Sequence, residues 1–125
     1  MIGIINTTQN TAITGGFIGK LIGTVNNAYS TVAVIAAGDS GVFAGQFTSG
    51  TINRSYTAGS LTASIASSAR SAGGFIGYHA AGNINDSYSL SNVIGTNTVA
   101  DSSVGGFLAH HVTGAITNSY STGLV

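Results

Sequence analysis

Short runs of aliphatic and aromatic residues alternate along this chain with clusters of glycine, serine, threonine and asparagine, and the same arrangement returns several times. Each return begins with a Gly-Phe or Gly-Val-Phe step and reaches a tyrosine 12 or 13 residues later. The phenylalanines lie 26, 32 and 32 residues apart: Phe17, Phe43, Phe75 and Phe107. The tyrosines lie 27, 32 and 32 residues apart: Tyr29, Tyr56, Tyr88 and Tyr120. A period of this length predicts one supersecondary unit stacked on copies of itself.

Aligning the repeats on these aromatic residues brings other residues of one kind into register. One aliphatic column lies between them: Val25, Ile52, Ile84 and Ile116. A second lies five residues after each tyrosine: Val34, Leu61, Val93 and Val125. We expect the aromatic and aliphatic columns to form the ladders of the core. A glycine column precedes the first aliphatic column by two residues and predicts turns, because glycine readily adopts a positive φ: Gly23, Gly50, Gly82 and Gly114.

These columns predict an all-β fold, a single-stranded parallel β-solenoid (β-helix) with right-handed winding. It would have about four coils of roughly 26–32 residues, stacked about 4.8 Å apart so that like residues lie on like. In the third repeat, the predicted strand-like runs are Phe75–His79, Asn83–Tyr88 and Val93–Val99. A β-propeller is disfavoured because its blades need about 40 residues each. An antiparallel sandwich would not require residues to be in register across repeats.

One domain is predicted over residues 1–125. The repeats cover about 15–40, 41–72, 73–104 and 105–125, and residues 1–14 complete a partial coil. The segments that vary in length predict one corner that carries loops: Ile35–Ser40, Thr62–Ala72 and Ile94–Val104. The stretch Ala63–Ala72 has the best helix propensity of the chain, but its place in the repeat favours a loop.

The repeat resembles a known sequence motif. Gly105–Val125, GGFLAHHVTGAITNSYSTGLV, is similar to the GLUG repeat, which runs GGLVG, then a glycine, an isoleucine and NSYATG. Gly73–Val93 and Gly41–Leu61 match well, and Gly15–Val34 matches with a deletion of one residue. The resemblance covers four copies and implies β-solenoid segments of large bacterial surface adhesins of the filamentous-haemagglutinin kind, or of some secreted proteases. It implies stalks or binding surfaces, and it carries no catalytic residue.

Composition narrows the classes of function. Charged residues make up 5% of the chain, with three Lys+Arg, three Asp+Glu and a formal net charge of zero. Nucleic-acid binding needs clustered lysine and arginine, which this chain lacks. No apolar stretch approaches the roughly 20 residues of a membrane span, so membrane insertion is not expected. There is no cysteine, and the N-terminal residues do not form a signal peptide, so an extracellular or cell-surface location would need a targeting signal outside this chain.

The histidines are the first candidates for chemistry. His79 and His111 occupy one column, and His110 is next to His111. Two imidazoles on adjacent coils could share a metal ion, but the other members of the column are Leu21 and Phe47. We therefore interpret the column as a packing position, and we expect no metal and no cofactor.

Polar columns are interpreted as structural. Asn26, Asn53 and Asn85 share a column, which predicts a ladder of amides that bond along the stack. Arg54 and Asp86 share another, which predicts an ion pair across adjacent coils. The few scattered aspartates do not form a pair of carboxylates, so we expect no enzyme activity. A column of hydroxyl residues beside the tyrosines is considered for ice binding: Ser30, Thr57, Ser89 and Ser121. Ice binding would need flat rows of threonine, and the best threonine column is interrupted: Thr24, Thr51, Asn83 and Ala115.

The expected role is therefore structural or adhesive, as a non-enzymatic repeat module of a bacterial surface or secreted protein. The two ends of the chain have nearly the same phase in the repeat, which predicts that the chain stacks head to tail into fibres or continues into neighbouring repeats of a longer chain. Val125 has the phase of Val93, and the same phase is expected near residue 3. The alternatives are a solenoid face that binds a glycan, a host surface or ice, and an accessory domain of a secreted protease.

Overall fold

The computed structural model of the protein describes residues 3–9, 11–65, 70–97 and 100–125. Within these ranges the secondary structure consists of β-strands, and no helix is present. Every strand pairing in this part of the chain is parallel, as the chain runs repeatedly through the same four sheets. The prediction of an all-β fold built from parallel strands is confirmed.

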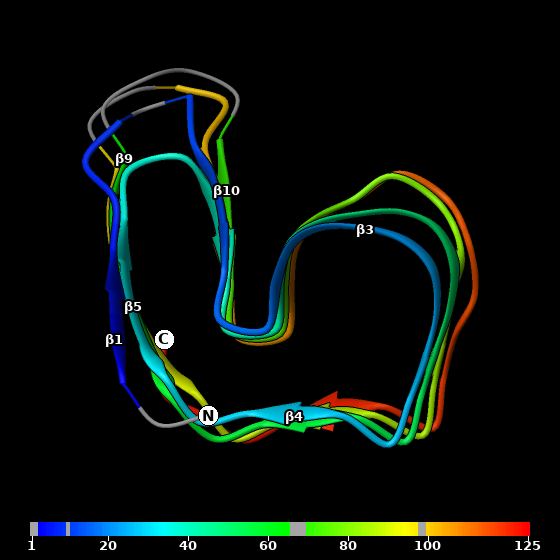
Figure 1. The fold of residues 1–125 in the computed structure, drawn as a ribbon. Helices are drawn as coiled ribbons and strands as arrows, with labels where there is room; N and C mark the ends of the chain where they lie inside the picture. The colour runs from blue at the N-terminus through cyan, green and yellow to red at the C-terminus, as the bar shows by residue number, and fades with distance from the viewer. Residues whose placement is uncertain (1–2, 10, 66–69, 98–99) are drawn as a thin grey trace.

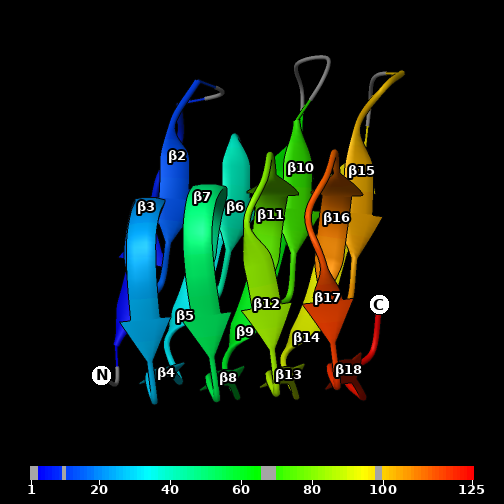
Figure 2. The ribbon, with the colours of Figure 1, turned by 90° about the vertical axis from the view of Figure 1, so that its right-hand side faces the viewer.

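Each sheet takes its strands from successive repeats. Sheet A contains β1 (Ile4–Asn6), β5 (Ala33–Ala36), β9 (Ser60–Ile65) and β14 (Asn92–Asn97), and sheet B contains β2 (Ile13–Gly15), β6 (Asp39–Gly41), β10 (Ser71–Gly73) and β15 (Ser103–Gly105). Sheet C contains β3 (Ile18–Asn26), β7 (Ala44–Asn53), β11 (Ile76–His79), β12 (Asn83–Asn85), β16 (Leu108–His111) and β17 (Ile116–Thr117). Sheet D contains β4 (Tyr29–Ser30), β8 (Tyr56–Thr57), β13 (Tyr88–Ser89) and β18 (Tyr120–Ser121). Figure 2 shows the strands of sheet C side by side along the stack.

The pairing register places each residue against its counterpart in the neighbouring repeat. Ile84 pairs with Ile52 on one side and with Ile116 on the other. Tyr88 likewise pairs with both Tyr56 and Tyr120. Because neighbouring parallel strands lie about 4.8 Å apart, side chains of one kind form continuous columns along the stack.

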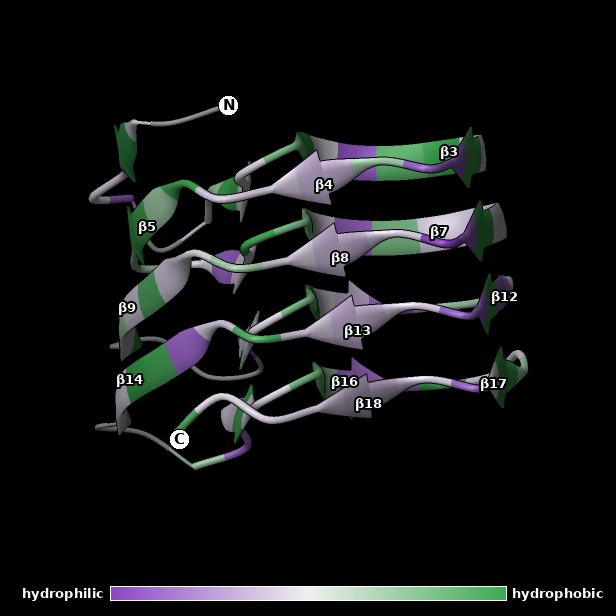
Figure 3. Cartoon of the chain, turned by 90° about the horizontal axis from the view of Figure 1, so that it is seen from below, coloured by the Kyte–Doolittle hydropathy of each residue, from purple (hydrophilic) through white to green (hydrophobic). Residues whose placement is uncertain are grey.

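The outline of the chain has two arms, each with its own core (Figure 1). Sheets A and B run side by side in the narrow arm and enclose an aliphatic cluster that includes Val34, Leu61 and Ile65. Sheet C arches over the wider arm and sheet D closes it below, around a cluster that includes Phe43 and Phe75. Seen from below in Figure 3, the strands of sheet D are pale, whereas β5, β9 and β14 carry strongly hydrophobic positions.

The shorter first repeat is accommodated at two places. The register between β3 and β7 shifts between Leu21 and Ile22, because Leu21 pairs with Phe47 and Ile22 with Ser49. This irregularity absorbs the one-residue deletion between phenylalanine and tyrosine. The corner between sheets A and B absorbs the rest, since β5 and β6 follow each other closely whereas β9 and β10 are separated by a longer connection.

The strands differ in detail from the predicted runs. Sheet B, with strands of three residues, was not expected. The run Asn83–Tyr88 is divided into β12 and β13 by Asp86, which has a φ of 50°. Of the stretch Ala63–Ala72, the described residues include the end of β9 and the start of β10, and residues 66–69 lie outside the described part. Of the predicted run Val93–Val99, residues 98 and 99 lie outside it as well.

Gly45 and Gly77 of sheet C lie close to the backbone of sheet B at the junction of the two arms. A Cβ atom on Gly77 would lie 2.5 Å from the carbonyl oxygen of Ser40 and 2.6 Å from that of Ser71. A side chain at this position would push the two sheets apart. The requirement for glycine here is therefore one of close backbone approach.

The phenylalanine ladder runs through the wide arm. The ring centroids of successive phenylalanines lie 4.7–4.9 Å apart, from Phe17 through Phe43 and Phe75 to Phe107. Phe43 and Phe75 are fully buried, whereas Phe17 is 46% exposed and Phe107 is half-buried. We expected Phe107 to be buried as well; it belongs to the last repeat, where no further strand covers it.

The tyrosine ladder is not in the core, contrary to our expectation. Tyr29 and Tyr120 are 50% and 54% exposed, and Tyr56 and Tyr88 are half-buried. The side chain that follows each tyrosine is buried instead in the first three repeats, at Ser30, Thr57 and Ser89. Successive residues of a strand face opposite sides of the sheet, so a buried hydroxyl places the tyrosine before it outside.

The phenylalanine ladder predicts that the loss of stability on truncation depends on position within the ladder. Phe75→Ala should lower the free energy of unfolding by about 3–5 kcal/mol, because it removes a fully buried ring and leaves a cavity. The matched change Phe17→Ala removes the same side chain from the exposed end of the ladder and should cost clearly less. Urea unfolding followed by circular dichroism measures both, and equal losses at the two positions would contradict the burial of the ladder.

Candidate functional site

The asparagine column forms an amide ladder on the outside of sheet C. The Asn53 side-chain amide donates to Asn26 Oδ1 at 2.8 Å, and the Asn85 amide donates to Asn53 Oδ1 at 2.9 Å. Thr117 pairs with Asn85 through the backbone and carries no amide to continue the ladder. Asn53, in the middle, thus donates one hydrogen bond to the preceding repeat and accepts one from the following repeat, which makes the ladder a link along the stack.

The tyrosine column forms a stacked aromatic ladder on the outside of sheet D. The ring centroids lie 5.3, 5.1 and 5.2 Å apart, and the interplanar angles are 6–9°. The faces of the rings therefore lie against one another. What each ring turns to the outside is its edge.

Two columns of positive φ mark the corners that frame these ladders. The predicted turn glycines have φ values between 103° and 128°: Gly23, Gly50, Gly82 and Gly114. A second column with φ between 46° and 56° has no glycine and was missed by the sequence: Asn27, Arg54, Asp86 and Asn118. Asparagine and aspartate tolerate this left-handed conformation better than most residues, and that preference is the signal that could have identified the corner.

The expected ion pair between Arg54 and Asp86 is not formed. Arg54 Nε donates to Asn27 Oδ1 at 2.8 Å, and Asp86 Oδ1 accepts from the Asn118 amide at 3.0 Å. Both residues lie at a corner rather than within a strand. Each bonds there to the asparagine on its far side in the column, Arg54 to the preceding repeat and Asp86 to the following one.

A serine column that was not expected from the sequence links the repeats from inside. Ser55 Oγ donates to the carbonyl oxygen of Asn53 at 3.0 Å and accepts from the backbone N–H of Ala28 at 3.2 Å. The same pair of bonds recurs one repeat later, at Ser87, which accepts from the N–H of Ser55 at 3.2 Å. Ser55 and Ser87 are fully buried, and the bond from Ser55 N–H to Ser87 Oγ satisfies a backbone donor that water cannot reach.

The histidines lie where sheet C covers the wide core. The His79 ring is buried and stacks on Phe47, with centroids 5.1 Å apart and an interplanar angle of 5°. Its Nε2 lies 3.1 Å from the carbonyl oxygen of Gly82, and its Nδ1 lies 2.8 Å from His111 Nδ1. Exposed His110 belongs to a different column and stacks on Tyr78.

The contacts determine the protonation pattern of this histidine pair. A carbonyl oxygen can only accept, so His79 Nε2 carries a proton, and in neutral His79 the Nδ1 accepts from His111 Nδ1–H. Burial lowers the pKa of His79 below its ordinary value, and the nearby charge of His111 lowers it further. The interior position therefore favours the neutral ring, which is the state expected of a packing residue.

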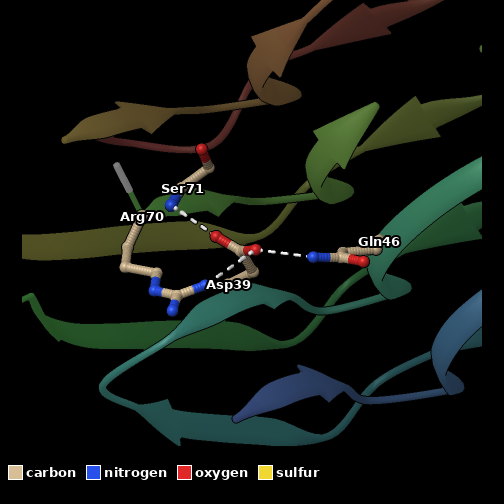
Figure 4. A network of polar contacts seen from close by, with 4 residues as sticks. All are labelled: Asp39, Gln46, Arg70 and Ser71. Carbon is tan, nitrogen blue, oxygen red and sulfur yellow. Dashed lines mark hydrogen bonds and ion pairs between the residues drawn. The ribbon is translucent and has the colours of Figure 1, made fainter. Parts of the chain in front are cut away.

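Asp39 has a polar environment that the sequence did not predict (Figure 4). This buried carboxylate accepts from the Gln46 amide at 2.7 Å and from the backbone N–H of Ser71 at 3.0 Å. An Arg70 guanidinium nitrogen lies 3.6 Å from the same carboxylate. Gln46 lies in β7 of sheet C and Arg70 lies just before β10 of the next repeat, so the two belong to different columns and a column alignment did not bring them together.

Most side-chain hydrogen bonds of the described ladders run from one repeat to the next. Within residues 3–9, 11–65, 70–97 and 100–125, no group of three or more His, Cys, Asp or Glu residues is placed to hold a metal ion. The same ranges contain no helix that is long and apolar enough to cross a membrane. What the arrangement does chemically is to connect each repeat to the next by hydrogen bonds and stacked rings.

Comparison with known proteins gives no relative. No protein-family profile, curated protein or solved structure matches the chain.

The buried histidine predicts a pH dependence of stability. Because the pKa of His79 is lowered in the folded state, the unfolded chain binds more protons, so the stabilising contribution is complete above pH 6.5 and is lost as the pH falls through the lowered pKa. Urea unfolding at a series of pH values should show this decline, and His79→Phe, which keeps a ring on Phe47, should flatten it. His110→Phe replaces an exposed histidine and serves as the control. A decline that persists in His79→Phe would assign the titration to another group.

The Asp39 network predicts a second effect on stability. Asp39→Asn removes the charge opposite Arg70 and turns an amide toward donors, so it should cost about 1–3 kcal/mol. Asp101→Asn is the matched control, because Asp101 is exposed and asparagine tolerates its φ of 64°. Thermal and urea unfolding measure the difference, and an Asp39→Asn protein as stable as the wild type would show that the network contributes nothing.

Proposed function

We propose that the chain is a β-solenoid of four coils that serves as a non-enzymatic structural or adhesive module of a bacterial surface or secreted protein. The parallel pairing of every sheet supports the solenoid, together with registers that advance by 27 residues and then by 32. The resemblance of the repeat to the GLUG motif supports the cell-surface or extracellular location. The ladders support a mechanical role, because they connect repeats rather than assemble a site.

The observation that carries the proposal is the exposure of the inner columns at the two end coils. Ile52 and Ile84 are fully buried, whereas Ile116 in the same column is 41% exposed. Phe17 is exposed at the other end of the phenylalanine ladder. These end faces combine apolar side chains with a strand edge, and such an edge is a template for a further strand.

A second copy of this chain fits these end faces. Ile5 pairs with Val34, so it has the phase of the aliphatic column that ends at Val125. The expected phase near residue 3 was therefore two residues too early, because the connection in the first coil is shorter than the alignment assumed. A copy stacked so that its Phe17 follows Phe107 and its Tyr29 follows Tyr120 would continue both ladders without a register slip. Its Ile5 would then fall at the level of Val125, so one of these two terminal segments has to move aside in the assembly. The absence of strong charge removes repulsion that would oppose this contact.

The alternative of a ligand-binding face has less support. The internal amides of the asparagine ladder bond to one another, which leaves them poorly disposed for a glycan. The hydroxyl column considered for ice binding is buried in the first three coils, at Ser30, Thr57 and Ser89. An accessory domain of a secreted protease would use the same solenoid as a spacer, and nothing in the described geometry favours it.

Sedimentation velocity over a range of concentrations tests the proposal. The wild-type chain should associate as its concentration rises, and Ile13→Lys combined with Val125→Lys should abolish association, because it places a charge on each end face. The matched control, Thr62→Lys with Ser64→Lys, adds the same charge to the exposed side of β9 and should associate like the wild type.

Electron microscopy of the same samples should show fibres whose axis follows the stack of coils. A strictly monomeric wild-type chain at high concentration, with its folded structure intact, would overturn self-association. The end faces would then be assigned to neighbouring repeats of a longer chain. Equal association of the end-face variant and its control would place the contact elsewhere on the surface.

A further inference from the structure

The tyrosine rings of neighbouring repeats are stacked on one another and are also partly exposed to solvent. Tyr29, Tyr56, Tyr88 and Tyr120 lie on strands of two residues on the outside of sheet D, with successive ring centroids 5.1–5.3 Å apart. The rings are nearly parallel and partly accessible to solvent. Accessible phenols held this close together in pairs are substrates for oxidative coupling.

We propose that the tyrosine ladder is a modification site at which one-electron oxidation joins neighbouring tyrosines through a carbon–carbon bond, forming dityrosine between adjacent repeats. The oxidant is of the peroxidase class and uses hydrogen peroxide. The ladder geometry favours this reaction over coupling at any other tyrosine of the chain. The inference concerns the side of the stack and does not depend on association through the end faces.

The chemistry balances within one pair of rings. Each phenol gives one electron and one proton to the oxidant and becomes a phenoxyl radical. The two radicals join at the carbons ortho to their oxygens, and the hydrogens on those carbons move to the oxygens as both rings regain aromaticity. One hydrogen peroxide takes up the two electrons and two protons and becomes two molecules of water.

The surroundings of the ladder provide both access and restraint. Tyr56 and Tyr88 are partly exposed although neighbouring rings cover both of their faces, so an oxidant can reach the ring edges, where the ortho carbons lie. The backbone of each strand is held by parallel pairing to the next, as between Tyr56 and Tyr88. The rings therefore stay near one another, while a side chain on the outer face can still turn to bring two ortho carbons together.

Tyr78 provides a control within the same chain. It lies in sheet C, its register partners are Gln46 and His110, and its ring stacks on His110. It has no tyrosine in the neighbouring position of its column. It should be oxidised without forming an intramolecular dityrosine.

The consequence of coupling would be a covalent bond between residues that are 27 or 32 positions apart in sequence. A bond of this kind restricts the unfolded chain in the way that a disulfide does, and the restriction grows with the length of the closed loop. In a chain without cysteine, the tyrosine ladder would offer a means of cross-linking the repeats. The modified stack should therefore unfold at a higher urea concentration than the unmodified one.

The test compares two double variants that keep the same number of ladder tyrosines. Tyr29→Phe with Tyr120→Phe leaves Tyr56 and Tyr88 adjacent, whereas Tyr29→Phe with Tyr88→Phe leaves Tyr56 and Tyr120 two steps apart, about 10 Å. Phenylalanine keeps the stacked rings, and circular dichroism verifies the fold of both variants. Each is treated at low concentration with a heme peroxidase and hydrogen peroxide, and the monomer is isolated under denaturing conditions.

The variant that keeps Tyr56 and Tyr88 should contain at least about tenfold more intramolecular dityrosine than the variant that keeps Tyr56 and Tyr120, because proximity raises the effective concentration of the second radical. Dityrosine fluorescence measures the yield, and mass spectrometry of peptides identifies the joined residues by the loss of two hydrogen atoms. Tyr78→Phe should leave the wild-type yield unchanged. Equal yields in the two double variants, no dityrosine in either, or cross-links that map to Tyr78 would overturn the proposal.

Discussion

The in-register parallel pairing of like residues is the constraint on which the rest of the structure depends. Each repeat is too short to enclose a core, so its inner side chains are buried mainly by the repeats on either side. A slip of one residue would turn the inner columns outward, and the first repeat lacks one residue between Phe17 and Tyr29. The irregularity at Leu21 and Ile22 corrects the register before Val25 reaches Ile52. The aliphatic and tyrosine columns beyond that point can therefore continue unbroken.

The same constraint determines where polar groups can be buried. A hydroxyl inside the stack can bond to a small polar group at the same position in the next repeat, as Thr57 does to Ser89 at 3.1 Å, although Ser30 Oγ in the same column is buried without a hydrogen-bond partner. Ser55 and Ser87 use this repetition to satisfy backbone N–H groups of the preceding repeat. Removing one such hydroxyl would leave a buried donor without its acceptor, a change that costs more than the bond itself contributes. The small residues of the repeat are thus as constrained as the aromatic ones.

The sequence predicted which residues stack, because a fixed period places equivalent residues in register whatever their chemistry. It did not predict which side of the sheet they face, and the tyrosines were therefore assigned to the core. A strand of two residues such as Tyr88–Ser89 is too short to show an alternating pattern, and the aromatic residue suggested burial more strongly than the serine did. The contacts of Asp39 could not be predicted for a different reason. Gln46 and Arg70 reach it across the fold from other columns, and the period contains no information about such contacts.

The direction of the side-chain interactions bears on what this surface can do. The bonds of Asn53, Arg54 and Asp86 all run along the stack to the neighbouring repeat. A binding site requires polar groups that converge on a point outside the backbone, whereas these groups point at one another. Lengthening the stack adds more of the same internal contacts without creating a new kind of surface. Within the described residues, each repeat therefore adds the same contacts along one axis, which is the arrangement that the proposed structural role would use.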